Sequence, residues 1–432
     1  MGRTLPTTKL AAIATMAMML TACPKAANTA STSTTPKTLY IASGQCHSGI
    51  GITTYSNVTA SRAVTKWDTS SGDFKSVFTD LNVAQNVSAG TVPQSMIDKG
   101  DHLLLLTENP SATGGDRKIW KIMKNDPSTY ITYATDPTAF TITAGHITRS
   151  MAQDTDGSIV FSKSLMMEKV STVGARLVKG GANPWVNSTG VAGNCFTAAA
   201  SLISNVQIMT PFTGASQGKI IYLHSGNTAV LNRIGVSSRT GMTTATAADC
   251  MGSSAAGGAS ATPHVNGGTL LGPVGLAVTG SSLTSSVYIP TPSPALTTGK
   301  LIVSYAPSVV TQFDNNTTFN TGIVVWDVTE TTDLVAATSV TFTNPTIIWR
   351  DDSVVWAPSA LAYDSTDSSL YVAVGGAPGV INQTTSNFGY NVEKFTLNTS
   401  TFLLTRVAVN NAPFIQGNAY TKCISDLKLA DQ

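Results

Sequence analysis

Histidine is the first residue type to test for chemistry, because imidazole serves both as a general base and as a metal ligand. The chain has five, at His47, His102, His146, His224 and His264. They show neither an H-x-H nor an H-E-x-x-H spacing, so no local zinc pattern is present. The sequence also lacks a G-x-S-x-G nucleophile elbow and a Walker phosphate loop. The absence of these local motifs favours a role other than catalysis.

Three short segments offer the oxygen ligands that calcium prefers. They are DTDGS at 154–158, FDNN at 313–316 and WRDDS at 349–353. The first lacks the later ligands and the acidic twelfth residue of a calcium loop. Asp-Gly between two apolar runs is also a common hairpin turn. We interpret all three segments as solvated turns.

The N-terminal segment has the layout of an export signal. Two basic residues precede an apolar run at 10–22, which is too short for a permanent transmembrane helix. The run ends in LTAC at 20–23, which resembles the lipobox of bacterial lipoproteins. That resemblance implies cleavage before Cys23 and attachment of acyl chains such as palmitate to it. Residues 1–22 are then a signal peptide.

A flexible tether is expected between the lipid and the folded domain. Residues 24–35 (PKAANTASTSTT) are small and polar and have nothing to pack. We assign 23–37 to the lipidated cysteine and its tether, and 38–432 to a single domain. In Gram-negative lipoproteins an Asp after the lipidated Cys favours the inner membrane. Pro24 stands there, so the resemblance implies an outer-membrane protein on the periplasmic or surface face.

The charge content excludes one class of partner. Charged residues make up 12% of the chain, against about 25% in typical soluble proteins. The net charge is only +2 and Lys and Arg do not cluster, which argues against nucleic acid binding. Surfaces rich in Ser, Thr and Asn suit a glycan or another envelope protein. We expect a monomer that contacts the membrane only through the lipid on Cys23.

Two elements recur along the chain, which indicates a repeat architecture. The first is a strand–turn–strand unit in which a small residue precedes two apolar ones. Its copies place four small residues at one position: Ser95, Ser150, Gly275 and Ala360. The second is a strand–turn–strand unit with a matching aromatic residue: Trp67, Trp120, Trp326 and Phe395. We interpret the small residues as the start of an inner strand at a crowded axis, and the aromatic residues as packing between sheets.

Four antiparallel strands per repeat make the blade of a β-propeller. The pattern in APSALAYDSTDSSLYVAV, from Ala357, resembles NHL-like six-bladed propellers. We therefore predict an all-β propeller with six four-stranded blades, seven being the alternative. Five blades begin near 92, 147, 195, 272 and 357. The sixth needs strands from both termini, 38–46 and 421–431, and this closure leaves no open edge.

The cysteines support this closure. Apart from Cys23 there are four, and an even number in an exported protein suggests two disulfides with three possible pairings. If the two terminal strands pair antiparallel, Cys46 lies opposite Cys423. We predict disulfides between Cys46 and Cys423 and between Cys195 and Cys250.

Some propellers of related type are calcium-dependent lactonases or esterases that hold the metal with Glu, Asn and Asp. That resemblance singles out Glu108 and Asn109, although they follow a second strand rather than open an inner one. Glu otherwise occurs only at 168, 330 and 393. No cofactor is therefore expected, and a lactonase- or esterase-like hydrolase using calcium in the central channel is the alternative function.

Long segments rich in Gly, Ser, Thr and Pro are the candidate binding loops. They lie at 47–62, 251–269 and 291–300. Loops on a rigid scaffold often carry binding sites. The sequence thus predicts a non-enzymatic binding or scaffolding lipoprotein of the bacterial envelope, with protein or glycan partners.

Overall fold

The computed structural model describes most of the chain from Lys37 onward. The described ranges are 37–44, 61–84, 86–109, 117–134, 148–163, 166–178, 201–208, 219–226, 233–238, 265–266, 281–291, 297–307, 322–331, 339–349, 358–374, 391–408 and 412–431. The chain divides into the units Met1–Thr35 and Pro36–Gln432, and every described residue belongs to the second. Within these ranges no helix is long and apolar enough to cross a membrane.

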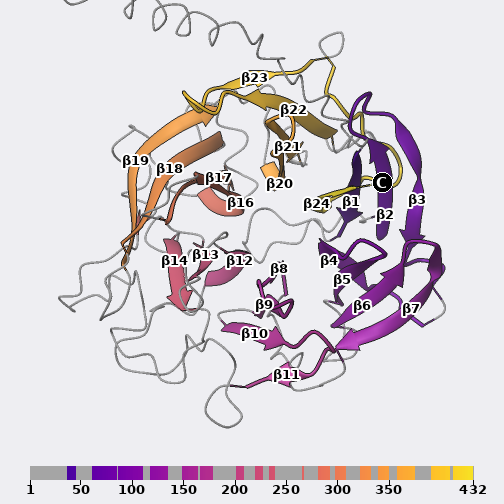
Figure 1. Cartoon of the computed structure of the whole chain (residues 1–432). Helices are drawn as coiled ribbons and strands as arrows, with labels where there is room; N and C mark the ends of the chain where they lie inside the picture. The colour runs from indigo at the N-terminus through magenta and orange to yellow at the C-terminus, as the bar shows by residue number, and fades with distance from the viewer. Residues whose placement is uncertain are drawn as a thin grey trace, which may run out of the picture. The chain divides into compact units, whose positions relative to one another are not determined.

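The described strands form six four-stranded antiparallel sheets, and the blades follow one another around a ring (Figure 1). This arrangement is a β-propeller, as the sequence predicts. Three sheets come from the first half of the ring. They contain β4 (Val92–Asp98), β5 (His102–Glu108), β6 (Lys118–Met123) and β7 (Asp126–Ala134); β8 (Met151–Gln153), β9 (Ile159–Lys163), β10 (Met166–Val170) and β11 (Arg176–Leu177); and β12 (Ser201–Ile208), β13 (Lys219–Gly226), β14 (Arg233–Ser238) and β15 (Val265–Asn266).

The other three sheets complete the ring. Two are again continuous in sequence: β16 (Ser281–Thr291), β17 (Thr297–Pro307), β18 (Gly322–Thr331) and β19 (Ser339–Trp349); and β20 (Pro358–Asp364), β21 (Ser369–Val374), β22 (Asn391–Leu397) and β23 (Leu404–Arg406). The last sheet has the order β24-β1-β2-β3 and joins the two ends of the chain. Its strands are β1 (Lys37–Ser43), β2 (Ala63–Asp68), β3 (Phe74–Asp80) and β24 (Ile424–Asp431).

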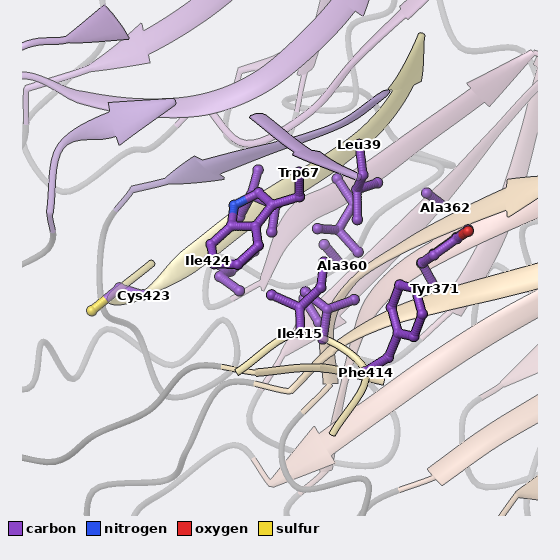
Figure 2. Close-up of a cluster of buried hydrophobic side chains, with 13 residues drawn as sticks. Leu39, Trp67, Ala360, Ala362, Tyr371, Phe414, Ile415, Cys423 and Ile424 are labelled. Carbon is purple, nitrogen blue, oxygen red and sulfur yellow. The ribbon is translucent and has the colours of Figure 1, made fainter. Parts of the chain in front are cut away.

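The closing sheet confirms the predicted union of the termini. β1 and β24 pair antiparallel from Lys37 opposite Asp431 to Ser43 opposite Ile424, with one bulge near the end. Leu39 (Figure 2) and Ile41 pack against the β20–β23 sheet. Tyr40 and Ala42, on the opposite face, pack against the β4–β7 sheet. Because neighbouring blades cover both faces, an apolar side chain is favourable at every position of the strand.

The run of leucines in β5 follows from the same geometry. Leu103 and Leu105 pack against the closing sheet, whereas Leu104 and Leu106 pack against the β8–β11 sheet. All four are buried. The four recurring aromatic residues stand on the third strand of their sheets and are buried between blades: Trp67, Trp120, Trp326 and Phe395. They pack sheet on sheet, as expected.

One repeat was placed wrongly by the sequence pattern. The unit beginning at Gly272 predicts an inner strand near Gly275 with its partner at 283–290. Instead β16, Ser281–Thr291, is itself the innermost strand and pairs with β17. Gly275 lies outside the described residues. Within the predicted loop at 291–300, Thr291 belongs to β16 and Thr297–Lys300 to β17, and 292–296 lie outside the described residues. Pro290 is tolerated in β16 since an edge strand needs no outward N–H donor.

Candidate functional site

The innermost strands of all six sheets surround a central cavity. Its volume is about 370 Å³. The lining comes from β4, β8, β12, β16, β20 and β24, so each blade contributes. In β4 the lining residues run from Ser95 to Asp98, and in β24 from Asp426 to Leu429. A pocket on this axis is the best candidate for a ligand site in the described part of the ring.

The innermost strands share a local irregularity. In β4, β12, β16, β20 and β24 the pairing register shifts at one residue near the start of the strand. The residues skipped in the register are Gln94, Ser204, Thr284, Ser359 and Ser425. Arg149, directly before Ser150, takes the matching position ahead of β8. A β-bulge redirects side chains without breaking the strand, so these bulge positions re-aim polar groups at one end of the cavity.

The residues that follow the bulge link neighbouring blades. The Met151 amide donates to Ser95 Oγ at 3.2 Å, and the Val206 amide donates to Ser150 Oγ at 3.1 Å. The Leu361 amide donates to Ser285 Oγ at 3.1 Å. Each hydroxyl thus satisfies an edge-strand amide of the next blade. Ser95 and Ser150, two of the four small residues of the sequence repeat, have this role, and an apolar side chain there would leave the amide unpaired. Ala360 stands at the same position in β20 and has no hydroxyl to donate or accept.

Asp426 holds the corresponding position in β24, and the sequence pattern did not single it out. Its Oδ2 accepts the Met96 amide at 2.6 Å and the Ser95 hydroxyl at 3.1 Å, while Oδ1 accepts the Leu427 amide at 2.9 Å. Burial raises the pKa of this carboxyl to about 6, against the opposing effect of these hydrogen bonds. An acidic residue inside an apolar terminal strand is the signal that would have identified it.

Glu108, a candidate metal ligand, is fully buried and already engaged. Arg117 Nε donates to its Oε1 at 2.6 Å. The backbone amide and hydroxyl of Thr148 donate to Oε2 at 2.9 and 2.8 Å. The adjacent Asn109 donates from Nδ2 to the Ala89 carbonyl at 3.2 Å. The carboxylate therefore joins the β4–β7 sheet to the segment that precedes β8.

Two further glutamates have cationic partners on outer strands. Glu168 contacts both Nε and Nη2 of Arg176 at 3.0 Å, and Glu393 contacts Arg406 at 2.9 and 3.0 Å. Both are bidentate pairs, which add directional as well as electrostatic stabilisation. No group of three or more His, Cys, Asp or Glu side chains comes together within the described ranges.

Cys423 forms a disulfide. It is the sole cysteine in the described ranges, so its partner belongs to the rest of the chain, where Cys23, Cys46, Cys195 and Cys250 lie. The Gly44 amide donates to the Cys423 carbonyl at 2.8 Å, which brings the chain to within two residues of Cys46 at this point. Figure 2 shows the Cys423 sulfur at the edge of the apolar cluster between the closing sheet and β20–β23.

The other predicted ligand segments are accounted for in part. DTDGS is the β8–β9 hairpin turn, closed by the Asp154 amide on the Ser158 carbonyl at 2.8 Å, and Asp154 pairs with Lys169 at 2.8 Å. His102 pairs with Asp101 at 2.6 Å, and His224 stands in β13. Trp349 ends β19. The rest of 349–353, all of 313–316, and His47, His146 and His264 lie outside the described residues.

The two ends of the ring differ in the length of their connections. At the end where innermost strands finish, here called the turn face, β4 joins β5 between Asp98 and His102, and β20 joins β21 between Asp364 and Ser369. At the opposite end, here called the loop face, seven connections have at least 14 residues: Ser43 to Ala63, Ala134 to Met151, Leu177 to Ser201, Asn266 to Ser281, Pro307 to Gly322, Val374 to Asn391 and Arg406 to Ile424. The exceptions are β12–β13 and β14–β15, which have 10 and 26 residues at the turn face, and β9–β10, which has two at the loop face. Long connections thus concentrate at the loop face.

Comparisons with known proteins give fold-level likeness alone. No family model and no curated protein matches the chain. A Bacteroides caccae protein of unknown function has a TM-score of 0.45 at 8% identity, covering 92% of this chain and 100% of its own. A Xanthomonas campestris gluconolactonase has 0.36 at 10%, covering 85% and 84%. A domain described as the extracellular part of a B. thetaiotaomicron one-component system has 0.36 at 10%, covering 89% and 36%.

Proposed function

We propose that this protein is a β-propeller lipoprotein of the bacterial envelope that acts as a binding or scaffolding module for protein or glycan partners. The observation that carries the proposal is the concentration of long connections at one face of a rigid ring. Loops held by a packed scaffold are common binding elements, since the scaffold limits the entropy lost on binding. In this proposal a lipid on Cys23 anchors the chain, with the outer membrane as the site of attachment.

The strand register supports this geometry. Lys37, the first residue of β1, pairs with Asp431 at the end of β24, so both strand ends lie at the turn face. Lys37 Nζ also contacts Asp364 at 2.5 Å and Thr366 Oγ1 at 2.6 Å, beside the β20–β21 turn. A tether that joins the ring at Lys37 therefore meets it at the turn face. In this proposal the loop face is the one that contacts a partner.

Site-specific crosslinking in native membranes tests this proposal. A photo-crosslinker replaces exposed Ala89 in the connection that leads to β4 at the loop face, and a matched probe replaces exposed Asp101 in the β4–β5 turn. We expect a discrete adduct from position 89 and none from position 101. A Cys23→Ser variant should lose membrane association. Equal labelling from both faces, or no adduct at position 89, would argue against a scaffold.

The second candidate is a calcium-dependent hydrolase of lactones or esters that uses the central cavity. The observation in its favour is that all six blades line this cavity. Its metal would require ligands other than Glu108, whose two oxygens already accept hydrogen bonds from Arg117 and Thr148. Metal analysis combined with a lactone and ester panel tests it: tightly held calcium and EDTA-sensitive turnover would replace the scaffold proposal.

A further inference from the structure

Two adjacent blades carry long polar side chains at the bulge position, where the other blades have hydroxyls. These are Gln94 at the start of β4 and Arg149 just before β8. The Met151 amide donates to Ser95 Oγ at 3.2 Å, which joins the residue after Gln94 to the second residue after Arg149, so the two positions stand near the start of neighbouring strands. Both directly precede residues that line the central cavity, Ser95 and Ser150. Neither Gln94 nor Arg149 is itself among the lining residues, so the pair stands just beyond the loop-face end of that cavity.

Three donor atoms of this pair have no partner. Arg149 Nε and Nη2 and Gln94 Nε2 are buried and form no hydrogen bond. At the same position in other blades, Ser425 Oγ donates to the Pro93 carbonyl at 2.8 Å and Thr284 Oγ1 donates to the Pro358 carbonyl at 2.5 Å. The bulge position thus satisfies a short hydroxyl in those two blades, whereas Ser359 Oγ in the β20–β23 sheet has no partner. Buried side-chain donors without partners are rare in proteins and costly, so three on two long side chains of neighbouring blades, one of them a cation, require a reason.

The local charges leave one uncompensated cation. Glu108 is paired with Arg117, whereas Arg149 forms no ion pair with a described residue. Burial lowers the pKa of Arg149 to about 10, and the nearby Glu108 carboxylate opposes that shift, so the guanidinium stays charged at neutral pH. A buried charge without a counter-ion is unfavourable unless a ligand supplies one.

We propose that Arg149 and Gln94 form a binding site for the carboxylate group of a small ligand at the loop-face end of the central cavity. The guanidinium fork binds a planar carboxylate through two parallel hydrogen bonds. The Gln94 amide supplies a third donor. A monoanion fits better than phosphate or sulfate, because the site offers one net positive charge and the Glu108 carboxylate stands close enough to repel a second negative charge. The site does not depend on the scaffold role.

Ligand-dependent thermal stability of the full chain tests the site. Dialysed protein in chloride-free buffer is titrated with acetate, lactate and N-acetylglycine, and with phosphate and sulfate at matched ionic strength. We expect saturable stabilisation by at least one monocarboxylate and none by the dianions. Arg149→Met should abolish it, and Arg149→Lys and Gln94→Leu should weaken binding about tenfold by removing the fork or the third donor. Partner crosslinking at position 89 should be unchanged in these variants.

A comparison of two arginines separates a ligand site from a structural core residue. Without ligand, Arg149→Met should melt no lower than the wild type, because the variant removes an unpaired buried cation. Arg117→Met should melt lower, because it leaves Glu108 unpaired. Absence of monocarboxylate binding, equal binding by phosphate, or full binding by Arg149→Met or by both milder variants would each overturn the proposal. So would a loss of ligand-free stability in Arg149→Met as large as that in Arg117→Met.

Discussion

The closing sheet and the β4–β7 sheet each pair an innermost strand with a second strand, but the two pairs are connected in different ways. In the β4–β7 sheet the first and second strands are joined by a short turn between Asp98 and His102. In the closing sheet the first strand, β24, and the second, β1, come from opposite ends of the chain. Both pairs are antiparallel and bury their side chains between neighbouring blades. Blade packing, rather than chain continuity, therefore places the strands.

The closing sheet compensates for the missing turn in three places. Cys423, directly before β24, forms a disulfide. Lys37 at the other end of the strand pair contacts Asp364. Asp426 replaces the neutral serine that β4, β8 and β16 use toward the next blade. Stronger contacts therefore cluster where the chain is discontinuous.

Truncation of the last strand is expected to have the largest effect. A chain that ends at Tyr420 exposes β1 along its whole length and uncovers the cluster of Leu39 and Ile41. We expect the cooperative thermal transition to be lost and proteolysis to become rapid. A synthetic peptide of residues 421–432 should restore the transition and the resistance to protease by adding the strand in trans. A truncated chain with unchanged melting would show that the closing strand is dispensable.

Loss of the Arg117–Glu108 ion pair in the β4–β7 sheet is expected to have the second-largest effect on stability. Arg117→Met leaves the fully buried Glu108 without its cation. Removal of one partner from a buried pair costs about 3–5 kcal/mol. Urea unfolding measures the loss, and the double variant with Glu108→Gln should recover part of it. A loss below about 1 kcal/mol would mean that Thr148 alone satisfies the carboxylate.

The disulfide at Cys423 should stabilise the folded ring by about 2–4 kcal/mol, because it closes a long loop. Cys423→Ser should lower the free energy of unfolding by that amount, and reducing conditions should lower that of the wild type at least as much, because they also break the predicted Cys195–Cys250 bond. Peptide mapping without reduction identifies the partner. We predict Cys46, with Cys195 joined to Cys250. A peptide that links Cys423 to Cys195 or Cys250 would contradict this pairing.

Asp426 in β24 should make the free energy of unfolding depend on pH. Its folded-state pKa is raised to about 6, so protonation favours the folded protein. The contribution is fully present below the usual pKa near 4 and is lost as the pH rises through 6. Relative to Asp426→Asn, the wild type should gain up to about 3 kcal/mol between pH 7 and pH 4. Denaturant melts at each pH measure the difference, with Ser285→Ala as a control at the matching position. If the difference in unfolding free energy between the wild type and Asp426→Asn did not change with pH, Asp426 would not be the group that titrates.

Strand pairs and ring closure were readable from the sequence because they depend on local patterns. Turn residues such as Asp156-Gly157 and small residues such as Ser95 and Ser150 marked the hairpins and inner strands. The same pattern failed at Gly275, because Ser285 holds the equivalent position in β16 but is followed by Ser286 rather than by two apolar residues, so the repeat pattern did not mark it. Both terminal strands carry apolar side chains that must pack on two faces, and the neighbouring blades provide those contacts.

The candidate sites depended on tertiary structure for a different reason. Sequence singled out Glu108, but its contacts with Arg117 and Thr148 exist only once two blades pack together. Asp426 and Arg149 carry no local motif, and their properties come from burial and from the strand next to them. Local residue patterns were therefore enough to predict an export signal and to identify the repeat and the union of the two ends. The packing of the blades decided which polar groups are paired and which stay free at the axis, because desolvation and hydrogen bonding are set by neighbours distant in sequence.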